Sequence, residues 1–208
     1  MTEPPSLLSQ YNLATLRGRL NRVEPVDTRH DSEKRAAVSV VLHSPSPEDE
    51  VSVLFIRRAE CEGDPWSGHM AFPGGRRDAE DPDLLATALR ETHEEVGLDL
   101  ATHAEFLVRM PDVPANFRAA GIELTVAPFV FALRGEHVLA PNHEVAETLW
   151  VPLRALAAGE GAGAHAVHYE GREMRFPCIR VGERVIWGLT WWMLQAVLRE
   201  IHRECGVG

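Results

Sequence analysis

The chain has 208 residues, of which 45% are hydrophobic and 25% charged, and its formal net charge is −10. These values are typical of a soluble globular protein with a substantial buried core. The acidic balance argues against a broad nucleic-acid surface, which needs clustered Lys and Arg. A small phosphorylated ligand remains compatible with it, because one metal ion and one or two arginines can hold such a molecule.

The cysteines and the hydropathy pattern predict a cytoplasmic protein. Cys61, Cys178 and Cys205 are widely spaced and form no CxxC pair, so they fit neither a zinc site nor a disulfide framework. We expect reduced thiols. The first 20 residues lack the apolar core of a signal peptide, and no stretch approaches 18 consecutive apolar residues. We therefore expect no nucleic-acid partner and no membrane span.

The N-terminal third predicts one helix followed by strands. Leucines at roughly the helical period predict an amphipathic helix at about 6–22. Apolar, β-branched runs at 36–43 and 51–59 predict two strands, joined as a hairpin by a Pro/Ser/acidic turn. The Gly- and Pro-rich segment 63–82 predicts mostly loop, with a short strand at 69–72.

The clearest helix signal lies at 82–96. Asp81 suits its N-cap, Pro82 its first helical position and Gly97 the residue after its end. Beyond this helix the chain predicts strands at 104–110 and 123–133, a strand with a short helix at 147–159, a hairpin at 166–181 with Glu170-Gly171 at its turn, and a last helix at about 187–205.

Strands come in runs and do not alternate strictly with helices. This order predicts the α+β or mixed α/β class. We expect a single domain over 1–208, with the helices at about 6–22 and 187–205 packed on it. The last helix carries Trp187 and Trp191 on one apolar stripe, whereas Trp192 lies off it. An apolar residue off the stripe indicates a second packed surface, for which a homodimer is one explanation.

Three carboxylates crowd the helix at 82–96. Glu91, Glu94 and Glu95 are three and four residues apart, a spacing at which like charges weaken a helix by a few tenths of a kcal/mol per pair. At about 100° per residue they share one flank beside the buried stripe, and Arg90 lies one turn before Glu94. A solvated face and a hard-cation site are both consistent with this pattern. The double glycine just upstream favours the cation site, because glycine lets the backbone approach a ligand.

The segment 74–98 resembles the Nudix box, G-x5-E-x7-R-E-U-x-E-E-x-G-U, where U is a bulky apolar residue. Gly74-x5-Glu80 matches the first half, and residues 90–98 match the second half. Nine residues separate Glu80 from Arg90 where the pattern has seven, and one U position holds Thr92. The methyl group of Thr92 can pack in the buried stripe while its hydroxyl bonds back to the helix.

The resemblance implies a Nudix fold, an α/β/α sandwich around a mixed sheet, and a metal-dependent pyrophosphohydrolase. Such an enzyme cleaves a nucleoside diphosphate linked to another moiety. Arg90 would orient a glutamate through a salt bridge. The implied Mg²⁺ or Mn²⁺ ligands are three glutamates and a glycine carbonyl: Glu91, Glu94, Glu95, and Gly74 or Gly75.

The family usually recruits a further acid from a later loop, as metal ligand or general base. Glu144 and Glu147 lie just before or at the start of a predicted strand. Glu144 is favoured because it precedes Trp150 by six residues, a placement similar to that of the late glutamate in some members. A solvated loop remains the alternative for both.

Within the family, residues 35–205 resemble the coenzyme A pyrophosphatase-like branch. That branch usually shows R-[SA]-x3-R-x3-G-x3-F-P-G-G. Here Arg58-Ala59 and Gly68 through the double glycine fit, but the middle Arg is missing, and no Lys or Arg lies between Arg58 and Arg76. Because coenzyme A carries an extra 3′-phosphate, this gap weakens the case for it.

Coenzyme A or an acyl derivative is the leading substrate. The alternatives are a nucleotide sugar, a dinucleotide or an (oxidised) nucleoside triphosphate. A non-catalytic Nudix ligand sensor is the alternative from another class, and it would usually show eroded glutamates or a basic DNA-binding module. Trp66 could stack on a base or simply cover the core. Arginines come first as phosphate ligands because their bonding is bidentate. The candidates are Arg58, which we prefer, with Arg57, Arg76, Arg77 and Arg118.

Overall fold

The computed structural model describes residues 10–24, 26, 35–46, 49–63, 66–115, 124–169 and 171–203. Its helices are α1 (Leu13–Leu20), α2 (Leu84–Val96), α3 (Leu100–His103), α4 (Leu153–Ala157) and α5 (Gly188–His202). Its strands are β1 (Arg35–His43), β2 (Ser52–Arg58), β3 (Met70–Ala71), β4 (Gly74–Arg76), β5 (Ala104–Arg109), β6 (Val113–Pro114), β7 (Thr125–Leu133), β8 (Val145–Pro152), β9 (Ala162–Tyr169), β10 (Arg172–Val181) and β11 (Arg184–Trp187). Within these ranges, no helix has the length and apolar character needed to cross a bilayer.

Eight strands form one mixed sheet, in which β1 and β7 are parallel and the other pairs are antiparallel. The sheet divides along β1. Leu42 and His43 at its end pair with β2, whereas residues 36–38 at its start pair with β4. The predicted hairpin of β1 and β2 is therefore confirmed only near its turn. The division places the double glycine of β4 beside the end of β2.

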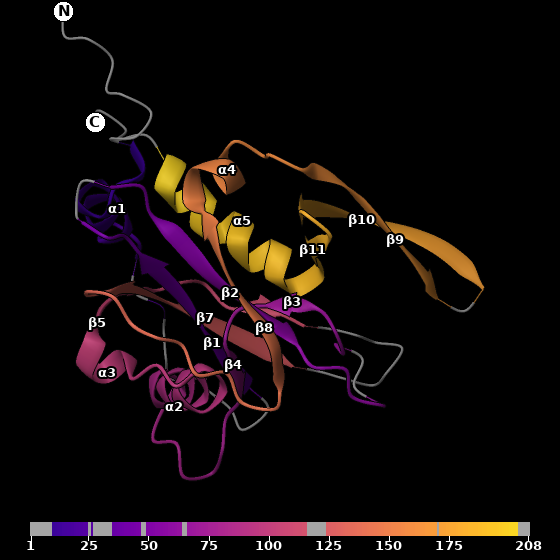
Figure 1. Ribbon diagram of the computed structural model, residues 1–208, viewed down its shortest axis with the longest axis horizontal. Coiled ribbons are helices and arrows are strands. Elements are labelled where there is room, and N and C mark those ends of the chain that lie inside the picture. The colour runs from indigo at the N-terminus through magenta and orange to yellow at the C-terminus, as the bar shows by residue number, and fades with distance from the viewer. Residues whose placement is uncertain are drawn as a thin grey trace, which may run out of the picture.

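Helices cover both faces of the sheet (Figure 1). On one face, α2 and α3 bury Leu84, Ala88 and Leu100 in one apolar cluster. On the other face, α1, α4 and α5 contribute to a second cluster. Each sheet face therefore has its own core, which is the arrangement of a layered α+β protein. The expected class and the α/β/α sandwich around a mixed sheet are confirmed.

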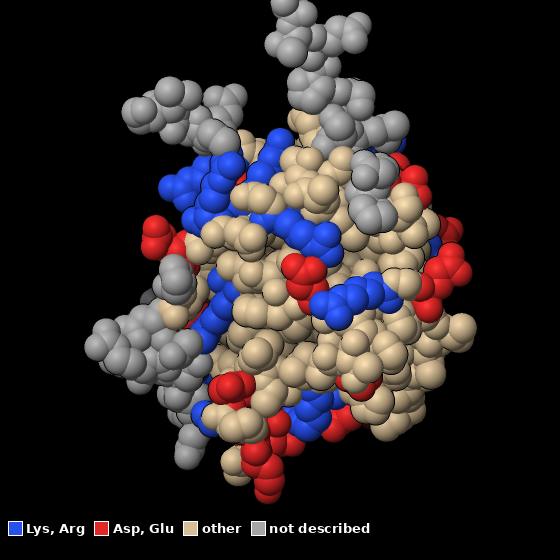
Figure 2. Space-filling view, turned by 90° about the vertical axis from the view of Figure 1, so that its left-hand side faces the viewer, with Lys and Arg blue, Asp and Glu red and all other residues tan. Residues whose placement is uncertain are grey.

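The first and last helices pack against each other. The guanidinium of Arg19 donates to the carbonyl of Ile201 over 2.8 Å, and the Tyr11 hydroxyl lies 2.7 Å from Nε2 of His202. The Ile201 carbonyl belongs to the last turn of α5, where carbonyls lack helical partners. Figure 2 shows basic side chains gathered near the top of this face, with acidic side chains scattered around them. Arg17 and Arg19 lie in the last turn of α1, and Arg199 in that of α5, where cations stabilise helices.

Strands β9, β10 and β11 form a separate three-stranded sheet, whose hairpin of β9 and β10 extends away from the rest (Figure 1). The hairpin confirms the prediction at 166–181, although β9 begins earlier. Its base is fixed by Trp187, whose ring centroid lies 4.9 Å from that of His69 and 4.7 Å from that of His165. Trp192 of α5 is exposed, and Trp191 packs edge-on against it. Homodimerisation through Trp192 stays a prediction.

Several predicted details were wrong or incomplete. Helix α1 begins at Leu13, where Asn12 caps it by accepting from the Thr15 amide, and residues 6–9 lie outside the described part. The segment read as loop around the double glycine contains β4, and β11 was not predicted. The thiols of Cys61 and Cys178 are free, and Cys205 lies outside the described residues.

Candidate functional site

The start of α2 corrects the predicted cap. Asp83, not Asp81, is the N-cap, and its carboxylate accepts from the Ala86 amide over 2.8 Å. Asp81 is buried instead and receives two bonds from Arg90, from Nε at 3.0 Å and from Nη2 at 2.9 Å. These bonds, together with those from Thr87 and the Asp78 amide, lower the pKa of Asp81 to about 2.

Asp81 is therefore the acid before the helix that pairs with Arg90, whereas Glu80 is the glutamate that matches the first half of the motif. Glu80 is exposed. The sequence pattern predicted Asp81 as the N-cap of the helix, so its pairing with Arg90 was not predicted. The sequence did offer a signal for this pairing: Asp81 is a second acid directly after Glu80, and it lies where the spacing to Arg90 is two residues longer than in the pattern.

Thr92 behaves as predicted for a polar residue in the buried stripe. Its hydroxyl donates to the Ala88 carbonyl of the same helix over 2.7 Å, and it also lies 2.7 Å from the hydroxyl of Ser39 on β1. Ser39 in turn donates to the Ala88 carbonyl. These buried bonds fix the rotation of α2 on the sheet, and with it the direction of the glutamates.

Glu95 is the most buried acid of the helix, with 2% of its side chain exposed. Its Oε2 accepts from the Gly74 amide over 2.8 Å, and its Oε1 lies 3.9 Å from Nη1 of Arg58. Loss of water around the carboxylate raises the pKa of Glu95 to about 7. The bond from the Gly74 amide and the charge of Arg58 oppose this rise, whereas the charges of Glu91 and Glu144 add to it.

Glu91 lies directly over Gly75. A Cβ atom built on Gly75 would fall 2.4 Å from the carboxyl carbon of Glu91, so a larger residue would displace this carboxylate. Burial also raises the pKa of Glu91, against the opposing effect of Arg90. Gly74 has another reason to be glycine: its φ is +148°, and its Cβ would lie 2.2 Å from the Ala37 carbonyl oxygen. The double glycine thus packs on β1 on one side and on the acids on the other.

Arg90 joins the acids of this helix. Its Nη1 lies 3.0 Å from Glu91 and 3.1 Å from Glu94, and its Nη2 donates to the carbonyl of Arg76 over 3.1 Å. Glu94 is the most open of the acids, with 52% of its side chain exposed. The expected flank of three carboxylates is therefore present, but its members are graded from buried Glu95 to exposed Glu94.

The two later acids have different surroundings. The main-chain carbonyl of Glu144 accepts from the Ala59 amide over 2.7 Å, directly after β2, and the charge of Glu144 acts on Glu95. Glu147 instead binds Arg184 of β11 and lies 3.6 Å from Nε of Arg57. The bond from Arg184 lowers the pKa of Glu147. Glu144, not Glu147, therefore faces the acidic helix.

The predicted substrate residues are spread around this centre. Arg58 lies at the end of β2 next to Glu95, whereas the side chain of Arg76 is exposed. Arg77 turns back to bind the Asp81 carbonyl. Trp66 is half-buried in the loop before β3. Arg118 lies outside the described residues.

The residues around the double glycine fit a hard cation. The donors are carboxylate oxygens, the type that Mg²⁺ and Mn²⁺ prefer, and two of them have a raised pKa because negative charge is unfavourable where they lie. Within the described residues, no three acidic, histidine or cysteine side chains already converge as metal ligands. Arg90 instead neutralises Glu91 and Glu94, so the carboxylates would have to turn toward an ion.

A family model described as NUDIX domain matches residues 33–170 of the chain. The chain belongs to the NUDIX domain family. The matched residues include β1, the Nudix helix α2 and all of β9, and they leave out α1 and α5 at the two ends.

Curated relatives agree with this membership. An uncharacterized protein of Schizosaccharomyces pombe is 39% identical over 112 residues, which are 52% of this chain and 34% of the relative. The "Peroxisomal coenzyme A diphosphatase ndx-8" of Caenorhabditis elegans is 32% identical, over 65% of this chain and 56% of the relative. The chain thus spans about a third to a half of these proteins.

Two further similarities extend beyond the matched segment. An uncharacterized Nudix hydrolase NudL of Photorhabdus laumondii is 28% identical, over 83% of this chain and 87% of the relative. A solved MutT/nudix family protein of Enterococcus faecalis is 17% identical, covers 94% of this chain and 74% of its own, and has a TM-score of 0.53. At this identity the structure supports the Nudix fold alone.

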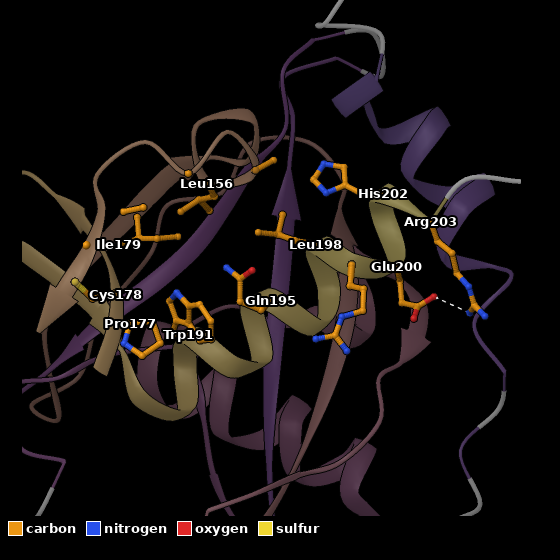
Figure 3. Close-up of a pocket in the computed structure, with 15 residues that line it drawn as sticks. Leu156, Pro177, Cys178, Ile179, Trp191, Gln195, Leu198, Glu200, His202 and Arg203 are labelled. Atoms are coloured by element: carbon orange, nitrogen blue, oxygen red, sulfur yellow. Dashed lines mark hydrogen bonds and ion pairs between the residues drawn. The ribbon is translucent and has the colours of Figure 1, made fainter. Parts of the chain in front are cut away.

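A hollow in the protein surface lies away from the Nudix helix. Its volume is about 920 Å³, and it lies between α4, the base of the hairpin and α5 (Figure 3). Its lining includes Leu156, Cys178, Ile179, Trp191 and Leu198. None of its described lining residues comes from α2, β4 or β8, so it is separate from the acidic centre.

Proposed function

We propose that the chain is a metal-dependent pyrophosphohydrolase that cleaves a nucleoside diphosphate linked to another moiety, with coenzyme A or an acyl-coenzyme A as the leading substrate. The observation that carries the proposal is the meeting of Glu91 and Glu95 over the double glycine of β4, with Arg58 beside them. A purely solvated acidic face gives no reason to bury Glu95 or to pack the Glu91 carboxylate against Gly75.

In this proposal Glu91, Glu94 and Glu95 hold Mg²⁺ or Mn²⁺, with a carbonyl of Gly74 or Gly75. A bound divalent ion supplies neutralisation of the pyrophosphate charge and a lower pKa for the attacking water. Arg90 keeps the glutamates on one flank, because Asp81 and the Arg76 carbonyl fix its guanidinium.

Glu144 is the proposed proton acceptor, because it faces the acidic helix and makes no ion pair within the described residues. Glu147 is a weaker candidate, since Arg184 keeps it ionised and turned away. Arg58 is the proposed ligand of a pyrophosphate oxygen, at a strand end within reach of Glu95. The Arg76 and Trp66 side chains remain proposed substrate contacts at the exposed edge.

The choice of coenzyme A rests on the name of the C. elegans relative and on the branch-like pattern around the double glycine. A screen of product release tests it. The substrates are coenzyme A, acetyl-coenzyme A, ADP-ribose, nucleotide sugars, dinucleotides and nucleoside triphosphates, each with Mg²⁺, with Mn²⁺ and with chelator. Coenzyme A or its acyl derivative should give the highest kcat/KM, and only with metal.

Two glutamine variants complete the test. Glu95→Gln should lower kcat on the order of 100-fold, because a buried metal ligand is lost. Glu80→Gln is the matched control and should keep activity, since Glu80 is exposed and outside the centre. An absence of metal-dependent hydrolysis with every substrate would favour a ligand sensor. Turnover of coenzyme A no better than that of ADP-ribose would overturn the substrate choice.

A further inference from the structure

A second group of charges lies next to the Nudix centre. Three charged side chains form an ion-pair trio, hereafter the trio: Arg57 of β2, Glu147 of β8 and Arg184 of β11. Arg184 binds Glu147 with two nitrogens, with Nε at 2.9 Å from Oε2, and Nε of Arg57 lies 3.6 Å from the same oxygen. The side chains are 37%, 29% and 34% exposed in chain order, so a ligand can reach them.

The trio lies at the same end of the β2–β8 pair as the catalytic centre. Arg57 and Arg58 are consecutive, but the register of β2 against β8 shifts between them, so that Arg57 lies opposite Glu147 and Arg58 opposite Val145. Arg58 reaches Glu95 under α2, whereas Arg57 reaches Glu147 on the other face. Glu147 of β8 follows Glu144, which lies just before the strand, by three residues. A nucleotide with its pyrophosphate at Arg58 needs to pass only around this strand end to meet the trio.

The charges of the trio favour an anion. Two guanidinium groups and one carboxylate leave one net positive charge. Glu147 holds Arg184 by a paired contact, which fixes the plane of the guanidinium before any ligand binds. A phosphomonoester carries about −1.5 to −2 charges at neutral pH and three acceptor oxygens, so it complements two guanidinium groups at one place. Exposed Glu183 also acts on Arg184, and reduces the field there.

We propose that Arg57 and Arg184, oriented by Glu147, bind a phosphomonoester on the ribose of the substrate nucleotide and so select for a 3′-phosphorylated substrate. The proposal rests on the coenzyme A class of substrate proposed above. It also accounts for the cation missing between Arg58 and Arg76. The positive charge is supplied by Arg57, the neighbour of Arg58 on β2, and by Arg184 of β11, which lies 126 residues after Arg58 in the chain.

The rival explanation is a structural one, in which the trio only fastens β11 to β8. Ligand preference separates the two. The probes are adenosine 3′,5′-bisphosphate, which is the nucleotide half of coenzyme A, and adenosine 5′-monophosphate, both titrated calorimetrically in the presence of Mg²⁺. The variants are Arg184→Gln and Glu147→Gln, with Glu183→Gln as the matched control one residue away. Thermal unfolding reports whether each variant is folded.

The wild type should bind the bisphosphate about tenfold more tightly than the monophosphate, and Arg184→Gln should abolish the difference. Glu147→Gln should keep the preference, because the amide oxygen of glutamine can still accept from Arg184 and hold it in place, while the negative charge that competes with phosphate is gone. Glu183→Gln should keep it as well. If the trio were purely structural, each of the variants Glu147→Gln and Arg184→Gln would instead change the affinity for the two nucleotides by the same factor, and the preference would stay as in the wild type.

Equal binding of the two nucleotides by the wild type overturns this inference, whatever the hydrolysis assays show. Loss of the preference in both Arg184→Gln and Glu147→Gln overturns it too. A tenfold preference that depends on Arg184, in a protein that hydrolyses no coenzyme A, would support the phosphomonoester site and overturn the proposed activity. The two failures are therefore distinguishable.

Discussion

The double glycine of β4 meets two different neighbours, and single methyl groups can separate their roles. Gly75→Ala places a Cβ within 2.5 Å of both carboxylate oxygens of Glu91, the movable end of a side chain. We expect the free energy of unfolding to change by less than about 1 kcal/mol. We expect kcat to fall on the order of 100-fold, because the carboxylate is displaced. Steady-state kinetics and urea unfolding measure the two effects.

Gly74→Ala is the matched variant with the opposite balance. Its Cβ would lie 2.2 Å from the Ala37 carbonyl and 2.6 Å from the Val38 Cα, both in the backbone of β1, at a φ of +148°. We expect a destabilisation of about 2–4 kcal/mol. Equal loss of stability in the two variants would contradict the assignment of Gly75 to the acids and Gly74 to the sheet.

The raised pKa of Glu95 predicts how metal affinity depends on pH. A pKa of about 7 means that Glu95 holds a proton below that pH in the metal-free protein. A carboxylate must lose this proton to bind metal, so the affinity should rise with pH, by up to about tenfold per unit below pH 7, and level off above it. Titration with Mn²⁺ at pH 6, 7 and 8 measures this dependence.

Glu80→Gln again serves as the control, since its exposed carboxylate should leave the pH profile unchanged. In Glu95→Gln the rise between pH 6 and 7 should shrink, and what remains would report Glu91, whose pKa is also raised. An affinity independent of pH in the wild type would show that Glu95 does not contribute to the metal site.

Among the elements, helix α2 could be predicted from sequence because its period, its end at Gly97 and its glutamates all agree. Its start was placed two residues early, because Asp81 and Asp83 are both acceptable caps, and only tertiary contacts occupy one of them with Arg90. Strand β4 could not be predicted, since glycine has low strand propensity. It forms because the start of β1 offers an edge with which β4 can pair. Gly74 can lie against this edge because it has no Cβ, which would collide with the backbone of β1.

The hairpin base shows a similar contrast between two glycines. Gly163 in β9 has ordinary backbone angles, and a Cβ there would lie 3.9 Å from the Cys178 sulfur, beside the hollow of Figure 3. We expect Gly163→Ala to stabilise the protein by about 0.5–1 kcal/mol, because alanine restricts the unfolded chain and adds contact. Thermal and urea unfolding measure the change.

Gly161, two residues earlier, should behave oppositely. Its φ is +76°, and its Cβ would lie 2.1 Å from the Arg180 carbonyl oxygen. We expect Gly161→Ala to destabilise the protein by about 2 kcal/mol or more. Destabilisation by Gly163→Ala of the same size would show that β9 packs more tightly than its contacts indicate.

At the scale of the molecule, the sequence was informative where the site is local and silent where it is assembled from distant strands. The glutamates and Arg90 lie within six consecutive residues, so spacing alone identified them as a group. Arg184 joins Arg57 and Glu147 only through the position of β11, which no local pattern predicted. Sequence reasoning therefore predicted the proposed reaction centre better than the surface that surrounds the rest of the substrate.

The two terminal helices lie outside the matched domain segment but share its core. Leu16 of α1 is fully buried in the cluster that includes α5. We expect Leu16→Ala to lower the free energy of unfolding by about 2–5 kcal/mol, because the fully buried side chain leaves a cavity in the packed cluster. The kcat/KM at low temperature should change less than about twofold, since the described contacts of α1 are with α5 and β5 and not with α2, which carries the site glutamates.

Gly18→Ala is the opposite-sign control on the same helix. Gly18 is exposed, and nothing described lies within 4 Å of a Cβ built on it, so alanine should stabilise α1 by about 0.5–1 kcal/mol through helix propensity alone. Calorimetric unfolding of both variants decides between two states of the molecule. If α1 is part of one cooperative unit with the sheet, Leu16→Ala lowers a single transition. A separate early transition with the main one unchanged would show that α1 and α5 unfold independently of the Nudix sheet.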